Sequence, residues 1–187
     1  MNLFSRLKRS DGDARFKYNN KSVLLGSKQG LFDNIVGFED VKSLFELAIN
    51  AERPVHLLLC GPPSSGKSLF MSSLTKLERS YYAVGSSSTK SGIFDYLFEH
   101  RPRYFIKDEL EKMNKKDQTS LLNLMESGIL SELKHNQQRT TQLKTWIFAS
   151  CNSTDKLLPP LLTRFRDIHF KSYTEEEFVE IVVNVLD

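Results

Sequence analysis

The most constraining feature of this sequence is a short apolar run that leads into a glycine-bounded loop ending in Lys-Ser. The run covers residues 55–60 (Val-His-Leu-Leu-Leu-Cys), and the loop covers residues 61–68 (Gly-Pro-Pro-Ser-Ser-Gly-Lys-Ser). The loop fits the pattern G-x-x-x-x-G-K-[ST], whose backbone N–H groups surround phosphate oxygens. The run predicts a buried strand, and Phe70, Leu74 and Leu77 have the spacing of one helical face. Strand, loop and helix therefore follow one another as a phosphate-binding loop requires.

Individual residues of this loop have predicted tasks. Gly61 and Gly66 are expected to adopt torsions that a Cβ would forbid, so that successive N–H groups point at one anion. Lys67 would place its charge on the β- and γ-phosphates, Ser68 would offer a hydroxyl to Mg²⁺, and the following helix would add its positive N-terminal end. The expected phosphate contacts also include the loop's other residues and the one after it, Pro62, Pro63, Ser64, Ser65 and Leu69.

Composition and cysteine usage limit the class of protein. The chain has 187 residues, 40% apolar and 26% charged, which fits one globular core with a small appendage. No apolar run approaches the length of a membrane span and no signal peptide is recognisable, so we expect no membrane partner and a cytoplasmic or nucleoid-associated location. Cys60 and Cys151 each end an apolar run, which favours buried thiols over a disulfide framework or a metal site.

The first 30 residues form a basic segment. They carry seven basic and two acidic side chains, a net charge of +5, which leaves −2 for the rest of a chain whose total is +3. A basic tail can contact nucleic acid or an acidic partner. Polar termini without periodicity are more often flexible leaders, and we expect one here.

Further strands and helices alternate along the chain. Strands are predicted at residues 81–84, 104–107, 146–150 and 168–170, with helical patterns at 41–49, 93–98, 114–127 and 174–186. Asn114 and Gly128 have the residue types that begin and end a helix. Residues 129–135 and 140–145 predict a hairpin with residues 136–139 as its tip. Alternation of this kind implies an α/β fold with a parallel sheet.

Three features beyond the loop indicate nucleotide chemistry. Asp108 and Glu109 follow an apolar strand, whose carboxyl end faces the phosphates in such sheets, so Asp108 suits the Mg²⁺ shell and Glu109 suits the attacking water. Asn152 follows another strand, and its side chain could form hydrogen bonds with the γ-phosphate and with the attacking water. Arg164 suits an arginine finger directed at a neighbour's γ-phosphate, with Arg166 in reserve. The ordinary alternatives are a solvated acidic pair, a turn asparagine and a surface arginine.

In this order, the segments Pro-Pro-Ser-Ser-Gly-Lys-Ser, Asp-Glu, Ser-Cys-Asn and Leu-Leu-Thr-Arg-Phe resemble those of the AAA+ ATPases, over residues 32–187. The segment Asp-Asn-Ile-Val-Gly is similar to the family's adenine-contacting segment and adds Val36 and Gly37 to the expected contacts. The resemblance implies ATP and Mg²⁺ as cofactors and a three-layer αβα sandwich with strand order 5-1-4-3-2. It also implies ATP hydrolysis in a site shared between subunits of a homo-oligomeric ring, expected to be a hexamer. Lys107 departs from the family pattern, because a charge stands where an apolar residue is usual.

Within this family the sequence most resembles the RuvB-type branch-migration motors, through the Lys-Ser-Gly loop at residues 90–92 and the helix that leads into the hairpin. Minichromosome maintenance helicases and MoxR-type ATPases share the hairpin and the Leu-Leu-Thr-Arg-Phe segment. The resemblance implies a motor that acts on DNA, with a helicase or translocase activity. Its basic contacts would be Lys90, Lys134, His135 and Arg139. Any surface hairpin can carry such residues, so the alternatives are a protein-remodelling ATPase and a nucleotide-binding assembly subunit without turnover.

The expected domains are the leader at residues 1–30, the ATPase core at 31–172 and the first helix of a lid at 173–187. The family's lid continues beyond one helix, and RuvB also has a winged-helix DNA-binding domain. We therefore expect that the sequence is a fragment or that another chain supplies these parts.

Overall fold

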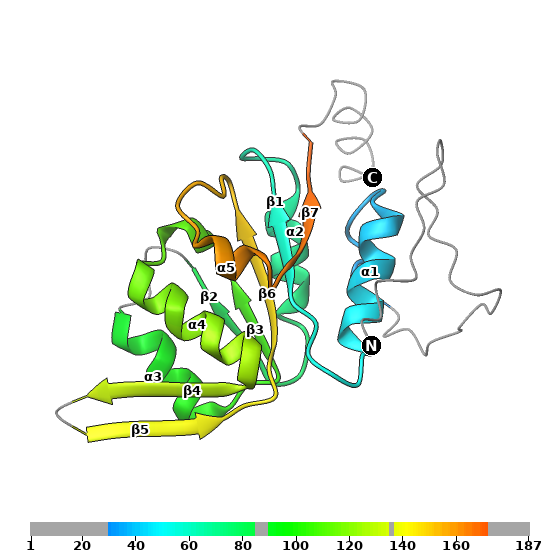
Figure 1. Cartoon of the computed structure of the whole chain (residues 1–187). Coiled ribbons are helices and arrows are strands. Elements are labelled where there is room, and N and C mark those ends of the chain that lie inside the picture. The colour runs from blue at the N-terminus through cyan, green and yellow to red at the C-terminus, as the bar shows by residue number, and fades with distance from the viewer. Residues whose placement is uncertain (1–29, 85–89, 135–136, 172–187) are drawn as a thin grey trace.

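The computed structural model describes residues 30–84, 90–134 and 137–171. Its main sheet contains five parallel strands, β1 (Leu57–Cys60), β2 (Ser80–Ala83), β3 (Tyr104–Lys107), β6 (Trp146–Cys151) and β7 (Arg166–His169). They lie in the order β2-β3-β6-β1-β7 (Figure 1). Numbered along the chain within this sheet and read from the β7 edge, that order is 5-1-4-3-2. The predicted α/β architecture and strand order are therefore confirmed.

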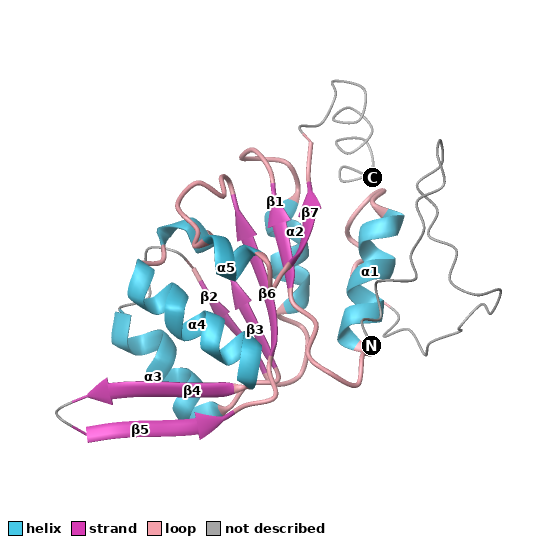
Figure 2. Ribbon diagram, viewed as in Figure 1, coloured by secondary structure: helices cyan, strands magenta, loops and turns pink. Residues whose placement is uncertain are grey.

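Helices cover both faces of this sheet (Figure 2). On one face lie α1 (Glu39–Ile49) and α2 (Lys67–Leu74); on the other lie α3 (Lys90–His100), α4 (Lys115–Ser127) and α5 (Pro159–Leu162), with a short 3₁₀ turn at Leu110–Lys112. Alternate residues of β1 divide between the two cores, because successive side chains in a strand point to opposite faces. Leu57 and Leu59 pack with Phe45 and Phe70, whereas Leu58 packs on the α4 side. The result is three layers with two separate apolar cores.

The ends of α4 follow the predicted capping residues. Asn114 accepts a 3.0 Å hydrogen bond from the backbone N–H of Asp117, which satisfies one of the unpaired donors of the first turn. Gly128 ends the helix in the left-handed region with φ +71°, where a Cβ would lie 2.8 Å from the carbonyl oxygen of Leu143. Both the positive φ and the lack of room for a Cβ require glycine at position 128. With this left-handed residue the helix ends, and the hairpin begins at the next residue.

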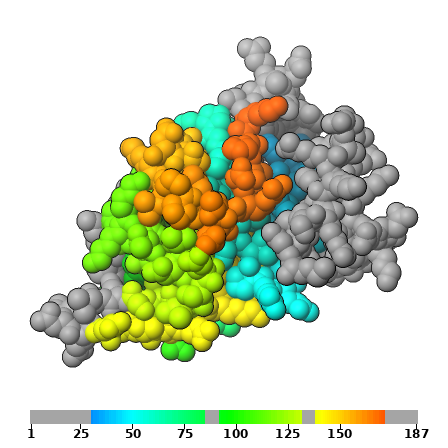
Figure 3. Space-filling view, in the orientation of Figure 1, coloured from blue at the N-terminus to red at the C-terminus, as the bar shows by residue number. Residues whose placement is uncertain are grey.

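The hairpin consists of β4 (Ile129–Lys134) and β5 (Gln137–Gln142), and β5 forms the lower rim of the molecule below α4 (Figure 3). The predicted tip at residues 136–139 is wrong in extent, because cross-strand pairing continues to Lys134 and Gln137. Arg139 therefore lies inside β5. Its guanidinium forms an ion pair with Asp95 of α3 and lies 4.2 Å from the ring centroid of Phe98. These contacts fix Arg139 against the body of the domain.

Several sequence predictions fall outside the described residues. These are the basic leader at 1–29, most of the loop before α3, His135 at the tip and the lid helix at 173–187, together with the side chains of Lys90 and Lys134. Within the ranges that the structure describes, no helix is long and apolar enough to cross a bilayer.

Candidate nucleotide-binding site

A cavity of about 430 Å³ lies at the carboxyl ends of β1, β3 and β6. Its walls are the loop residues 63–69 with Asp108, Glu109, Ser150 and Asn152. Most of the predicted site residues thus come together around one hollow, although they are spread over 90 positions of the sequence. Among the residues predicted for the nucleotide site, those that do not line it are Val36, Gly37, Gly61, Pro62 and Arg164.

The loop reaches its shape through two residues in the left-handed region. Gly66 has φ +88° and forms the N-cap of α2, and Ser64 has φ +60°, which is costly for a residue with a Cβ. Alternating backbone conformations of this kind direct successive N–H groups into one concavity that suits an anion. The torsional prediction is confirmed at Gly66, whereas the left-handed backbone of Ser64 was not predicted.

Gly61 is required for a different reason from the predicted one. Its φ does not lie in the left-handed region. A Cβ there would lie 2.4 Å from the carbonyl oxygen of Phe170, because the chain after β7 continues directly beside the start of the loop. The backbone N–H of Phe170 also donates a 2.7 Å hydrogen bond to the Cys60 carbonyl. Close backbone approach, and not torsion, selects glycine at this position.

Lys67 is buried, with a residue exposure of 6%. Its ammonium group donates hydrogen bonds of 2.7 and 2.6 Å to the carbonyl oxygens of Gly61 and Pro62, and one of 3.2 Å to the Ser65 hydroxyl. Burial lowers the pKa of this ammonium group from its ordinary value. The loop therefore holds a partly desolvated cation at the floor of the cavity, where a phosphate oxygen can replace the carbonyl partners.

Asp108 is held by three donors at the end of β3. The hydroxyl of Ser150 and the backbone N–H of Glu109 (3.0 Å) donate to Oδ1, and the phenol of Tyr82 donates to Oδ2 at 3.1 Å. Burial, assisted by the neighbouring Asp108 carboxylate, raises the pKa of Tyr82 to about 12, so the phenol remains a donor at neutral pH. The two side-chain donors come from β2 and β6, the strands that pair with β3, and they hold the carboxylate in the wall of the cavity that Ser68 also lines.

Glu109 has an exposed pairing partner. Its backbone is left-handed at φ +54°, and its carboxylate lies 2.6 Å from the Lys112 ammonium group. Surface pairs of this kind contribute about 1 kcal/mol at most, so a water molecule or a ligand can displace Lys112 at little cost. The backbone strain at a residue facing a cavity matches the usual placement of such strain at functional positions.

Asn152 is positioned through its backbone. Its N–H donates a 3.0 Å hydrogen bond to Oε1 of Glu111, so the exposed amide side chain remains available to the cavity. The second carboxylate oxygen of Glu111 is buried without a hydrogen-bond partner among the described residues. Glu111 was not predicted, since a carboxylate two residues after Asp-Glu has no motif of its own.

Lys107, the residue that departs from the family pattern, is almost fully buried at 1% exposure. It points to the α4 side of β3, and its ammonium group donates a 2.7 Å hydrogen bond to the Asp108 carbonyl. Burial lowers its pKa, and the nearby Asp108, Glu109 and Glu111 oppose that effect. The hydrogen bond from the Lys107 ammonium group thus stabilises the turn that carries Asp108 and Glu109.

Cys60 and Cys151 lie opposite each other at the ends of β1 and β6, as free thiols. The Cys151 thiol donates to the Cys60 sulfur at 3.4 Å, which lowers the pKa of Cys60 and raises that of Cys151. Within the described residues, no group of three or more His, Cys, Asp or Glu side chains could hold a metal ion. The pair forms part of the apolar floor beneath the phosphate loop.

Two predicted regions lie outside the cavity. Arg164, after α5, forms an ion pair with Glu126 of α4, and its side chain is 40% exposed. Val36 is 39% exposed, and the neighbouring Phe38 stacks on Phe170 with ring centroids 5.2 Å apart. The segment that contains Val36 and Gly37 is thereby attached beside the loop, whereas Arg164 is partly exposed and does not line its own chain's cavity.

Comparison with known proteins gives a family and several relatives of low sequence identity. Residues 57–173 match the family described as "ATPase family associated with various cellular activities (AAA)". The chain is 26% identical over 159 residues to proteins named DNA replication licensing factor mcm2 from Xenopus tropicalis and Xenopus laevis, an alignment that covers 70% of this chain. It spans only 18% of the length of those relatives. With a family match over more than half of its length, and with the loop, sheet order and acidic pair in place, this chain belongs to the AAA family of ATPases.

Proposed function

We propose that this chain binds ATP with Mg²⁺ in the cavity at the carboxyl ends of β1, β3 and β6, and hydrolyses it. The observation that carries the proposal is the convergence of Lys67, Ser68, Asp108, Glu109 and Asn152 on one hollow of about 430 Å³. Each of these residue types is suited to a separate part of phosphoryl transfer to water. Membership of an ATPase family supports the same activity.

The cavity fits the proposed cofactors chemically. The left-handed Ser64 and Gly66 form a concave run of N–H groups at the start of α2, where the helix dipole favours an anion. The hydroxyl of Ser68 and the carboxylate of Asp108 are hard oxygen donors of the kind that Mg²⁺ prefers. Bound Mg²⁺ would neutralise charge on the phosphates. Val36 and Gly37 would contact the adenine from the segment beside the loop.

The chain's own residues would divide the catalytic work. Lys67 exchanges the carbonyls of Gly61 and Pro62 for phosphate oxygens, a favourable exchange because charge-assisted hydrogen bonds to anions are stronger than those to neutral carbonyls. Glu109 leaves Lys112 and orients the attacking water, and Asn152 bonds the same water or the γ-phosphate. Expected outcomes are that Glu109→Gln still binds ATP but does not hydrolyse it.

The proposed site is shared between copies of the chain in a ring, expected to be a hexamer. Arg164 does not line its own chain's cavity and is partly exposed, which suits a residue that completes a neighbour's site. Its ion-pair partner Glu126 is itself exposed, so the guanidinium can exchange this carboxylate for a neighbour's phosphate at little cost. Stabilisation of transition-state charge by such an arginine is worth several orders of magnitude in rate.

We further propose that the chain uses ATP hydrolysis to act on DNA, in the manner of the RuvB-type motors or of the minichromosome maintenance helicases. It would then be located in the same compartment as the DNA. The support is that two relatives are named as DNA replication licensing factors, together with the hairpin and the basic residues of its sequence. Arg139 is fixed in β5, so Lys90, Lys134 and His135 are the remaining candidates for contacts there. The second candidate, protein remodelling in the MoxR manner, rests on the same hairpin.

ATP turnover measured with and without DNA distinguishes these two functions. The proposal expects single-stranded, duplex or branched DNA to raise the rate of turnover, with Lys67→Ala as the inactive control. Turnover that no form of DNA changes would contradict the DNA role while leaving ATP hydrolysis intact.

A further inference from the structure

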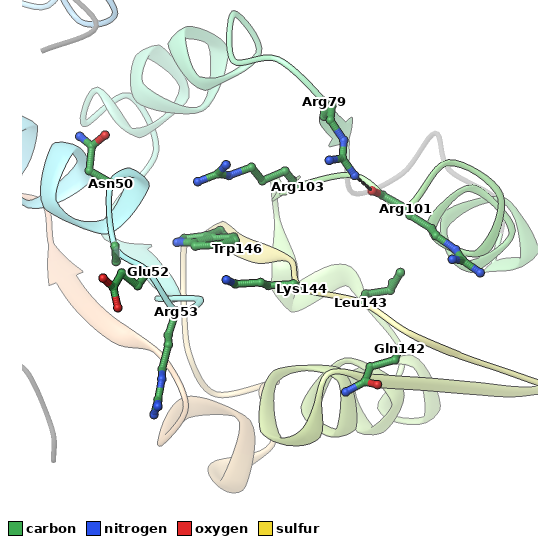
Figure 4. Close-up of a pocket in the computed structure, with 11 residues that line it drawn as sticks. Asn50, Glu52, Arg53, Arg79, Arg101, Arg103, Gln142, Leu143, Lys144 and Trp146 are labelled. Atoms are coloured by element: carbon green, nitrogen blue, oxygen red, sulfur yellow. Dashed lines mark hydrogen bonds between the residues drawn. The ribbon is translucent and has the colours of Figure 1, made fainter. Parts of the chain in front are cut away.

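A second and larger cavity, of about 830 Å³, lies at the opposite edge of the sheet from the nucleotide site. It opens where β2, β3 and β6 begin, between the end of α1 and the end of β5 (Figure 4). Its volume is within the range of about 300–1,000 Å³ that is common for ligand pockets. None of the predicted nucleotide residues lines it, so it is a separate feature of the domain.

The walls of this cavity are strongly basic. They carry five cationic side chains, Arg53, Arg79, Arg101, Arg103 and Lys144, against one carboxylate, Glu52. In the described part of the chain, none of the five forms an ion pair. Clustering unpaired like charges in a concave surface is unfavourable in isolation and concentrates a positive potential there. Such an arrangement is stabilised when an anion enters.

Two of these cations are arranged around Trp146. The guanidinium carbon of Arg103 lies 4.8 Å from the indole centroid, the Lys144 ammonium group lies 5.8 Å from it, and both side chains reach into the centre of the cavity (Figure 4). The indole is 2% exposed, and its Nε1 donates a 2.8 Å hydrogen bond to the Ala48 carbonyl. Because the ring is buried, it can orient the cations but cannot stack on a base.

Hydrogen bonds between arginine residues stabilise the rim of the cavity. The carbonyl of Arg79 accepts hydrogen bonds from the N–H groups of Arg103 (2.9 Å) and Tyr104 (3.2 Å), and the Arg79 guanidinium donates to the Arg101 carbonyl at 2.8 Å. Arg79 and Arg101 both have positive φ, +57° and +45°. Such strain persists only where surrounding contacts hold it, and it occurs preferentially at binding sites. The backbone of the rim, and with it the guanidinium of Arg79, is therefore held in place.

We propose that this cavity binds the phosphate backbone of nucleic acid without regard to sequence. Clustered cations recognise phosphates, and the buried indole leaves base stacking out of the contact. The end of β5, at Gln142, forms part of the cavity wall. A nucleic acid that runs along the hairpin would therefore reach the cavity directly. The inference rests on the proposed action on DNA for the identity of the polyanion, but not on ATP hydrolysis.

The test uses the full chain without nucleotide and a labelled oligothymidylate of twenty residues. Arg103→Gln/Lys144→Gln removes two cations from the cavity, and Lys76→Gln/Lys116→Gln removes two exposed cations elsewhere as the matched control. Each lost phosphate contact should reduce the slope of log affinity against log salt by about 0.7. The cavity variant should therefore bind about 20-fold more weakly at 0.1 M salt, with a slope shallower by about 1.4. The control variant should change the affinity by less than about twofold.

Unchanged ATP affinity and an unchanged circular dichroism spectrum should accompany the loss, since the nucleotide site lies at the other edge of the sheet. If the cavity variant unfolds, the charge-retaining Arg103→Lys/Lys144→Arg variant is tested, and the proposal expects it to keep most of the DNA affinity. Equal losses in the cavity and control variants would overturn the proposal. So would calorimetry in which tripolyphosphate binds the cavity and oligothymidylate does not, because the site would then serve a free polyphosphate.

Discussion

Ser150 and Asp108 are joined by a hydrogen bond between the ends of neighbouring strands. The Ser150 hydroxyl donates to Oδ1 of Asp108 and accepts a 3.2 Å bond from the Glu109 N–H, so one side chain contacts both members of the acidic pair. Ser150 is buried at 1% exposure and lines the nucleotide cavity. It is therefore a positioning residue for the acidic pair.

The Ser150→Ala variant should remain folded and bind ATP, but it should lose about tenfold in kcat, because a hydrogen bond to a carboxylate is lost and Asp108 becomes freer to move. Steady-state ATP turnover measures this. Ser72→Ala, an exposed position on α2, serves as the control. A proportional loss in ATP affinity with unchanged kcat would show that Ser150 does not position the acidic pair.

The Lys67→Ala variant should lose at least about 100-fold in ATP affinity, because two or more charge-assisted hydrogen bonds to phosphate disappear. Calorimetric titration with ATP and Mg²⁺ measures the affinity. Lys76→Ala removes an exposed lysine beyond the same helix and should leave it unchanged. Wild-type affinity in the Lys67 variant would refute the assignment of the phosphate loop.

The Gly61→Ala variant should be destabilised by about 2–4 kcal/mol, because its Cβ would overlap the Phe170 carbonyl, which belongs to backbone and cannot rotate away. Denaturant unfolding gives the value. Gly37→Ala is the matched comparison: its φ is +71°, but nothing lies within 4 Å of the added Cβ, so only the torsional cost of about 1–2 kcal/mol applies. Equal effects would argue against the close approach at Gly61.

His56 should make the free energy of unfolding depend on pH below pH 6.5. Burial lowers its pKa from 6.5 to about 4, while Nδ1 accepts a 3.1 Å hydrogen bond from the Ile147 N–H. Between those two pH values the unfolded chain takes up a proton that the folded chain does not, so stability is complete above pH 6.5 and is lost as the pH falls toward 4. The loss would be on the order of 3 kcal/mol. His56→Asn keeps an acceptor near Nδ1 and should flatten this part of the profile; an unaltered profile would place its origin elsewhere.

The sequence predicted most of the frame of the fold, because its signals are local. The loop pattern, the apolar strands, Asn114 and Gly128 each act on their immediate neighbours, and the order of the parallel strands followed from the family resemblance. Residues that depend on strand register were missed. Tyr82 and Ser150 reach Asp108 only because β2 and β6 pair with β3, and no local pattern marks either residue.

The predictions of which residues matter were more accurate than the predictions of what surrounds those residues in the folded chain. Gly61 was rightly singled out, but its constraint comes from Phe170, more than 100 positions away. Arg139 was expected at a free tip, whereas pairing across the hairpin and the contacts to Asp95 and Phe98 hold it in β5. The basic cavity around Trp146 left no signal, because its cations come from four separate connections that meet only in the folded sheet.

The central claim is a nucleotide site completed by a neighbouring copy, and mixing two inactive variants tests it most directly. Arg164→Ala and Glu109→Gln chains should each be inactive alone, because one lacks the finger and the other lacks the residue that orients water. In an equal mixture, random neighbours should restore about a quarter of wild-type ATP turnover, since half the sites retain Glu109 and half of those meet an intact Arg164. Lys67→Ala mixed with Glu109→Gln should show no recovery, because both changes disable the same half of the site. Recovery in the first mixture alone is the predicted result; no recovery in either mixture would contradict a shared site.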